Sequence, residues 1–175
     1  MLRTTLAGRL SVVLAAVAVT GAGLEPAYAV ERCAVSSKTV DNPAYSGPWP
    51  DNWDFTVKAC VTKSGPSVRH WTTISWDLPA SVTSAGSIFH ASGTNVEVTA
   101  MIEGGGLAVT KRTDLAERLN RAKDGSFTPA SHTTRWPSRY RLYTDVILFL
   151  DWKNDGKGPQ MLHFSPSPSI PGSAR

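Results

Sequence analysis

The chain has 175 residues, 41% of them hydrophobic, with 18 basic and 14 acidic side chains. This length is enough for one domain with a sizeable hydrophobic core. The net charge of +4 permits attraction to anionic polymers, but it is too small to indicate a polyanion-binding protein by itself.

The first 29 residues have the pattern of a secretory signal peptide. Arg3 and Arg9 place positive charge near the N-terminus, and an apolar run covers residues 10–19. Ala27-Tyr28-Ala29 then supplies the small residues that a signal peptidase recognises. The apolar run is much shorter than the roughly 20 residues that cross a bilayer, which argues against an anchor. Its composition resembles the export signals of high-GC Gram-positive bacteria. We therefore expect cleavage after Ala29 and a secreted, extracellular product without a membrane span.

Removing the first 29 of the 175 residues leaves a mature chain of 146 with two cysteines, Cys33 and Cys60. An even pair of cysteines outside the cytoplasm predicts a disulfide. A metal site would need more ligands at close spacing, and the chain has no CxxC motif. The chain-entropy model gives such a bridge about 3 kcal/mol of stabilisation.

The first clear strand follows a proline-rich loop at residues 41–52. Residues 53–62 alternate between apolar and polar side chains, which is the period of a half-buried strand. Cys60 falls on the polar side, so we expect the disulfide on the outer face of the sheet. A turn at residues 64–67 and a β-branched, aromatic run at residues 68–78 predict a hairpin.

The second half of the chain predicts another hairpin and one short helix. Residues 95–103 and 107–110 flank a Gly-Gly-Gly turn, and residues 114–123 have a helical apolar face, with Asp114 as cap and Glu117 completing a capping box. Residues 139–152 predict a central strand covered on both faces, because apolar side chains lie on both of its sides. A return strand is expected at 160–164.

Together these elements predict a mainly β fold, a single antiparallel β-sandwich or small barrel with one short helix near 114–123. We expect one domain at residues 30–165. Residues 166–175 are rich in proline and serine, which predicts a flexible tail.

The sequence shows no catalytic pattern, so we predict no catalytic residue, metal or cofactor. The histidines at 70, 90, 132 and 163 are too scattered to form a helical metal pair, and there is no GxSxG motif. Asp145 and Asp151 share a strand face, but they would lie about 20 Å apart. A glycosidase pair needs about 5 to 10 Å.

Tryptophan and arginine give the only positive signals for binding. Trp49 and Trp136 lie beside prolines in predicted loops, whereas the other four tryptophans suit the core or its rim. Arg135 and Arg139 flank Trp136 within a basic stretch that runs from 111 to 141. These four loop residues, Trp49, Trp136, Arg135 and Arg139, are our candidate ligand-binding residues.

Three functions fit these observations. The leading hypothesis is a non-catalytic extracellular binding or interaction module for a polysaccharide, cell wall, other polymer or protein. One alternative is a small secreted hydrolase such as a nuclease, with histidine and aspartate brought together by the fold. The other is a secreted enzyme inhibitor that would use the loop 43–50 or the Trp136-Pro137 loop.

Overall fold

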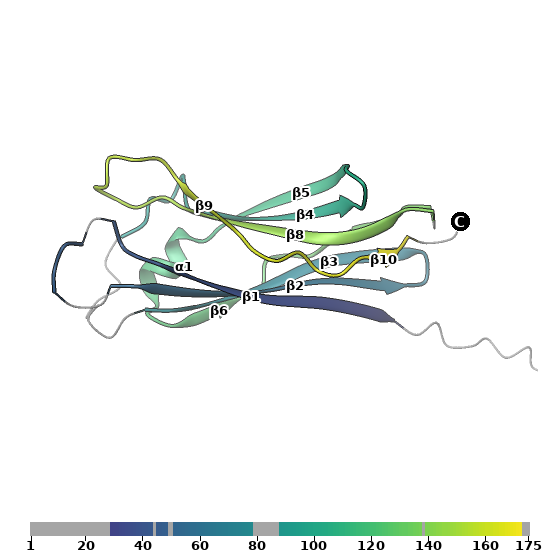
Figure 1. The fold of residues 1–175 in the computed structure, drawn as a ribbon, viewed down its shortest axis with the longest axis horizontal. Coiled ribbons are helices and arrows are strands. Elements are labelled where there is room, and N and C mark those ends of the chain that lie inside the picture. Colours follow the sequence, from purple (N-terminus) through teal and green to yellow (C-terminus); the bar gives the residue numbers. More distant parts are fainter. Residues whose placement is uncertain (1–28, 44, 49–50, 79–87, 138, 173–175) are drawn as a thin grey trace, which may run out of the picture.

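The computed structural model describes residues 29–43, 45–48, 51–78, 88–137 and 139–172, which form two antiparallel sheets packed face to face (Figure 1). The described strands make two separate sheets, so the predicted mainly β fold is confirmed as a sandwich rather than a barrel. Among the described residues, no helix is long and apolar enough to cross a membrane.

The first sheet has the order β1-β2-β3-β6, with β7 also paired to β3. The predicted hairpin is confirmed as β2 and β3, and β1 adds an N-terminal strand around Cys33. The two short strands on the far side of β3 were not expected, because three residues are too few to show a period of two. The bounds are β1 Val30–Val40, β2 Trp53–Ser64, β3 Ser67–Asp77, β6 Gly125–Phe127 and β7 His132–Thr134.

The second sheet has the order β10-β8-β4-β5, with β9 also paired to β8. The β4–β5 hairpin turns through Gly104 and Gly105, whose φ angles of 93° and 99° are ones that other residues rarely adopt. The predicted Gly-Gly-Gly turn is therefore confirmed. The bounds are β4 Asn95–Ile102, β5 Leu107–Asp114, β8 Arg141–Leu150, β9 Gln160–His163 and β10 Ile170–Pro171.

The central strand β8 differs from its prediction in one respect. It lies between β4 on one side and β9 and β10 on the other, as a central strand should. However, only its even-numbered face, from Leu142 to Leu150, is fully buried against the first sheet; the opposite face, which carries Ile147 and Phe149, is half-buried. Two sheets bury only one face each, so no further layer of described residues covers this side.

The space between the sheets holds two apolar clusters separated by polar side chains. The larger cluster centres on Trp53, Phe89 and Trp152, whose ring centroids lie 4.6 to 6.0 Å apart. A smaller cluster is formed by Val61, Val68, Leu142 and Ile170. Between the two along strands β3 and β8 lie fully buried polar residues: His70, Thr72 and Thr144.

The single helix among the described residues, α1 Ala116–Arg121, is shorter than the predicted 114–123. Asp114 accepts a hydrogen bond from the backbone N–H of Ala116 at 2.8 Å, but it belongs to β5. Glu117 forms an ion pair with Arg121 instead of a capping box. Leu119 is buried in the larger cluster, so packing rather than capping holds this short helix in place.

The predicted disulfide joins Cys33 to Cys60. The two cysteines are directly opposite each other in the β1–β2 register, on the side of the sheet that faces away from the second sheet. Cys60 is nevertheless fully buried, because Cys33 on β1 and Trp71 on β3 lie opposite it on either side. The bridge ties the edge strand β1 to the sheet.

Residues up to 172 pack against the sandwich, although the composition from residue 166 onward predicted a flexible tail; residues 173–175 lie outside the described residues. Residues 164–172, here called the C-terminal strap, cross the side of the sandwich between β1 and β8 (Figure 1). Ser167 donates a backbone hydrogen bond to Thr144, and Ile170 is fully buried in the smaller cluster. The Pro/Ser-rich composition predicted disorder, but one buried isoleucine and β8 pairing hold the segment.

Replacing Ile170 with alanine should therefore destabilise the protein by about 2 to 5 kcal/mol, the usual cost of truncating a buried aliphatic side chain. Urea denaturation followed by circular dichroism measures this change. Pro168→Ala, at an exposed position of the strap, is the matched control and should leave the midpoint nearly unchanged. Equal midpoints for Ile170→Ala and the wild type would show that the strap is not packed.

Candidate functional site

Residues 135–140 connect β7 to β8 and form what we call the Trp136 loop, of which all but residue 138 are described. The loop is braced from inside. The backbone N–H of Tyr140 donates to the carbonyl oxygen of Pro137 at 3.0 Å. The backbone N–H of Gly172, in the strap, donates to the carbonyl oxygen of Tyr140 at 2.7 Å. A Cβ atom at Gly172 would lie 2.5 Å from the carbonyl oxygen of Pro137, so this close approach requires glycine.

Two aromatic rings form the surface of this loop. Trp136 and Tyr140 pack edge to face, with centroids 5.6 Å apart and an interplanar angle of 85°. Trp136 is half-buried, because part of it packs on the smaller apolar cluster. The guanidinium of Arg139 lies 4.8 Å from the Tyr140 ring centroid and donates to its hydroxyl at 3.2 Å. Arg135 is exposed at the start of the loop.

The sequence-predicted binding residues are only partly described by the structure. Trp136, Arg135 and Arg139 share one loop, whereas Trp49 lies outside the described residues. Tyr140 was missed, because the alternation from residue 139 onward assigned it to the core face of a strand. Strand β8 begins at Arg141 instead. No local signal separates it from the strand, because Arg139-Tyr140-Arg141 continues the alternation of a half-buried strand.

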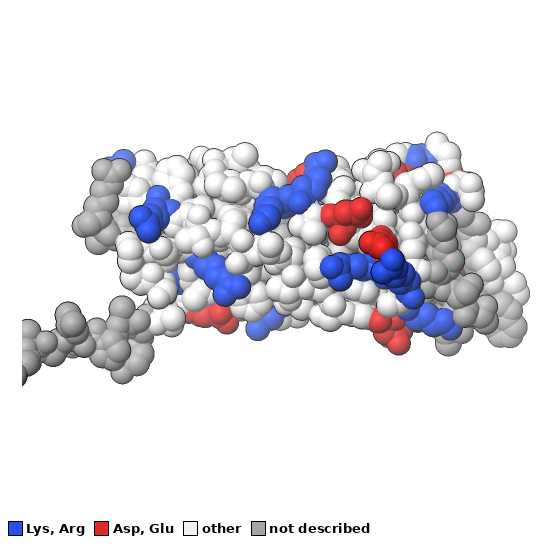
Figure 2. Space-filling model, turned by 180° about the vertical axis from the view of Figure 1, so that it is seen from behind, with Lys and Arg blue, Asp and Glu red and all other residues white. Residues whose placement is uncertain are grey.

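The basic stretch from 111 to 141 does not form one positive patch. Figure 2 shows the face opposite to that of Figure 1, with basic side chains in separate groups and acidic ones between them. Five arginines of the stretch have partners within the domain: Arg112 with Glu97, Arg121 with Glu117, Arg141 with Glu103, Arg118 over Phe127 and Arg139 over Tyr140. Three of the eight basic residues of the stretch therefore have a carboxylate partner, so only part of this charge is balanced locally.

The fold brings two of the scattered histidines together between the sheets. His70 of β3 and His132 of β7 are register partners, and their rings stack with centroids 5.2 Å apart and an interplanar angle of 13°. His70 is fully buried. Its Nδ1 lies 3.0 Å from the hydroxyl of Thr144, and its Nε2 lies 3.1 Å from the hydroxyl of Thr134.

The hydrogen bonds around His70 define its tautomer. Thr144 donates its single hydroxyl proton to the carbonyl oxygen of Cys60 at 2.7 Å, so it must accept from Nδ1–H of His70. Nε2 is then the acceptor and receives the hydroxyl proton of Thr134. The ring is therefore neutral and satisfied on both nitrogens. Burial, and next the neighbouring His132, lower the pKa of His70 from 6.5 to about 3.

His132 is held differently. Both of its ring nitrogens are buried and have no hydrogen-bond partner among the described residues. Burial, and next the positive charge of Lys111 on β5, lower its pKa below 6.5. His90 and His163 are exposed, and within the described residues no histidine pairs with a carboxylate. The described residues therefore place no carboxylate beside the pair to complete the base–acid arrangement of a hydrolase.

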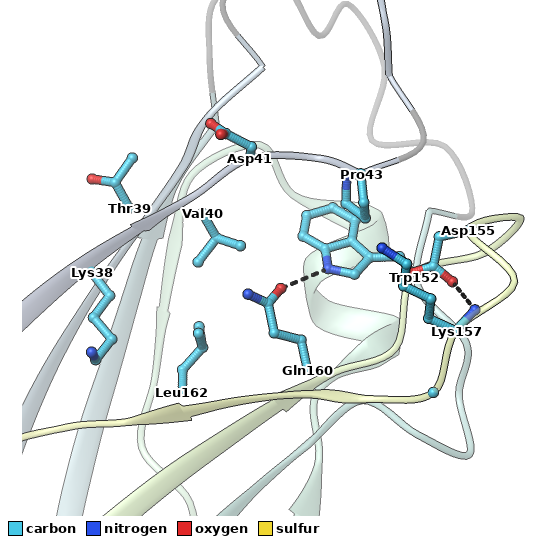
Figure 3. A pocket seen from close by; sticks show the side chains of 11 residues that line it. Lys38, Thr39, Val40, Asp41, Pro43, Trp152, Asp155, Lys157, Gln160 and Leu162 are labelled. Carbon is cyan, nitrogen blue, oxygen red and sulfur yellow. Dashed lines mark hydrogen bonds between the residues drawn. The ribbon is translucent and has the colours of Figure 1, made fainter.

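A groove of about 690 Å³ opens between β1 and β9 (Figure 3). Its apolar floor consists of Val40, Leu162 and Trp152, whose Nε1 donates to Gln160 at 3.4 Å. Each wall carries one lysine and one aspartate: Lys38 with Asp41, and Lys157 with Asp155. The opposite charges on each wall give no preference for an anion or a cation.

Glu31, Cys33 and Cys60 are of residue types that bind metal ions, and their ligand atoms lie close together. They form the one such cluster in the described part of the chain. Both of its sulfurs form the disulfide, so neither is available as a thiolate.

Comparison with known proteins adds no further constraint: no family model, curated protein or solved structure matches this chain.

The histidine pair should make the protein sensitive to acid. Because the folded-state pKa of His70 is about 3 and its ordinary value is 6.5, the unfolded chain binds the proton first. The free energy of unfolding should then decrease as the pH falls below about 6.5, by a few kcal/mol at about pH 4. Urea titrations at several pH values measure this slope.

The variant His70→Gln should flatten that slope, because an amide can donate and accept like the neutral ring but does not titrate. His163→Gln, at an exposed position on β9, is the control and should keep the wild-type slope. An identical slope in all three proteins would mean that carboxylates elsewhere cause the acid sensitivity.

Proposed function

We propose that the mature protein is a non-catalytic extracellular module that binds a polymer through the Trp136 loop. The observation that carries this proposal is the aromatic pair of Trp136 and Tyr140, which is partly exposed, flanked by Arg139 and braced from behind by Gly172. Aromatic rings held at the surface of a rigid scaffold bind sugars or bases at little entropic cost, because their positions are set before the ligand arrives.

The chemistry of the loop favours a ligand that has both rings and negative groups. Trp136 and Tyr140 offer ring surfaces for stacking, which is sequence-tolerant and independent of charge. Arg139 and Arg135 add guanidinium groups, which suit phosphate or carboxylate oxygens. Acidic wall polysaccharides and single-stranded nucleic acids combine these features.

The position of the rings also separates this proposal from an inhibitor. An inhibitor inserts a projecting loop into an enzyme's cleft, whereas Trp136 lies half-buried against the smaller apolar cluster. A half-buried pair suits a chain that lies across the surface of the domain. The loop 43–50 named for the inhibitor alternative is only partly described, since residues 44, 49 and 50 lie outside the described residues.

An extracellular location is part of the proposal. The disulfide between Cys33 and Cys60 is compatible with an oxidising compartment. The leader pattern of residues 1–29 supports export and lies outside the described residues, apart from Ala29.

Trp136→Leu and Tyr140→Leu should each weaken polymer binding about tenfold, because stacking is worth about 1 to 3 kcal/mol per ring. Leucine is chosen over alanine so that contact with the smaller cluster is retained. The assay is co-sedimentation with insoluble polysaccharide and purified cell walls, and fluorescence anisotropy with single-stranded DNA. Arg139→Ala should lower the salt dependence for an anionic polymer by about one counterion.

The matched controls come from the same protein. Trp71 is another partly buried surface tryptophan with a cation on its ring, Lys58 at 5.3 Å. Arg118 is another arginine that lies over an aromatic ring, Phe127 at 3.8 Å. Trp71→Leu and Arg118→Ala should leave binding unchanged. If they weaken it as much as the loop variants, or if none of the three polymers binds at neutral pH, the proposal is wrong.

Export predicts a defined N-terminus. Mature protein collected from the culture medium of an expressing bacterium should begin at Val30, which is also the first residue of β1. Edman sequencing or mass spectrometry of the intact protein measures this. A cell-bound product that keeps Met1 would contradict the signal-peptide prediction.

A further inference from the structure

The histidine pair and the Trp136 loop are adjacent in the chain. Strand β7 consists of only three residues, His132–Thr134, and Arg135 and Trp136 follow it directly. Among the described strands it pairs only with β3. A strand this short is held mainly by its side-chain contacts. The contacts that hold β7 therefore also set the position of the first half of the Trp136 loop.

Both inward-facing side chains of β7 contact His70. His132 stacks on its ring, and Thr134 donates a hydrogen bond to its Nε2. Thr133, between them, is exposed. His70 is therefore the shared contact of both inward-facing side chains of β7.

Protonation changes both contacts of this anchor. A proton on Nε2 of His70 makes this atom a donor, so the Thr134 hydroxyl must accept from it and turn its own proton to the carbonyl oxygen of Val68, 3.5 Å away. A proton on His132 creates a charge that faces His70 on β3 and Lys111 on β5. Strand β8 contributes Thr144, which is not ionisable, and no described carboxylate contacts the pair. Acid therefore adds repulsion without a compensating partner.

We propose that His70 and His132 form an acid-sensitive latch that keeps β7 docked and the Trp136 loop competent to bind, so that acidification releases the bound polymer. This inference rests on the proposed function for its binding consequence, although the latch itself is a property of the fold. It is a change of local docking equilibrium, since the disulfide and the larger apolar cluster contain no residue of β7.

The size of the effect follows from the charge states. When β7 undocks, His70 loses its cover and returns toward its ordinary pKa of 6.5, against about 3 in the docked state. At pH 4.5 the full difference shifts the docking equilibrium about 100-fold toward the undocked state, and this is the upper bound because Thr144 of β8 still contacts the ring. The shift begins below about pH 6.5, and His132 adds to it in the same direction.

Hydrogen–deuterium exchange measures the latch without any ligand. We expect the protection factors of the β7 amides, corrected for intrinsic exchange, to fall at least tenfold and at most about 100-fold from pH 7 to pH 4.5, while those of the β2 and β8 amides fall much less. His132→Phe keeps the stacked ring, has no nitrogen to titrate and leaves no hydrogen bond unmade, since the His132 nitrogens have no partner. It should reduce the loss of protection, and the double variant with His70→Gln should abolish it.

His163→Phe, at an exposed histidine on β9, is the matched control and should behave like the wild type. Binding of the polymer identified at pH 7 is then measured at pH 4.5, where the wild type should release it and the double variant should retain it. Equal loss of β7 protection in the wild type and the double variant would overturn the latch. A wild type that binds no polymer at pH 7 would overturn the proposed function. The exchange data would still test the latch, because they need no ligand.

Discussion

The closure of one open side of the sandwich by the C-terminal strap is the constraint on which the rest of the structure depends. Two sheets packed face to face leave their edges open to water, and here the side between β1 and β8 is closed by residues 164–172. Ile170 completes the smaller apolar cluster, and Gly172 supports the backbone of Pro137. The same segment therefore seals the core and braces the loop that carries the candidate binding residues.

The polar residues between the two clusters impose a second constraint. The burial of His70 leaves no ring nitrogen without a hydrogen bond, because Thr134 and Thr144 satisfy both of them. That arrangement holds only for the neutral ring. A hydrophobic residue at this position would give stability that does not vary with pH, so the histidine makes the stability of the sandwich, and the anchoring of β7 in particular, conditional on the proton concentration.

Local patterns were sufficient for the long elements and failed for the short ones. Alternation identified β2, a β-branched and aromatic run identified β3, and a long apolar run identified β8, while the cysteine pair identified the disulfide. Strands β6, β7 and β10 have two or three residues each, and a pattern with a period of two cannot be recognised in so few. Tyr140 and the packed strap were missed for a related reason: their environment is set by partners far away in the chain.

The sequence by itself determined the β-rich class, the main strands, the disulfide and the loop that holds Trp136, because these depend on local composition and periodicity. Only the tertiary structure decided that His70 meets His132, that Thr144 fixes the tautomer of His70, and that the strap lies under the Trp136 loop. These contacts join residues that are tens of positions apart. Their geometry follows from sheet register and from the packing of two sheets, which no local pattern encodes.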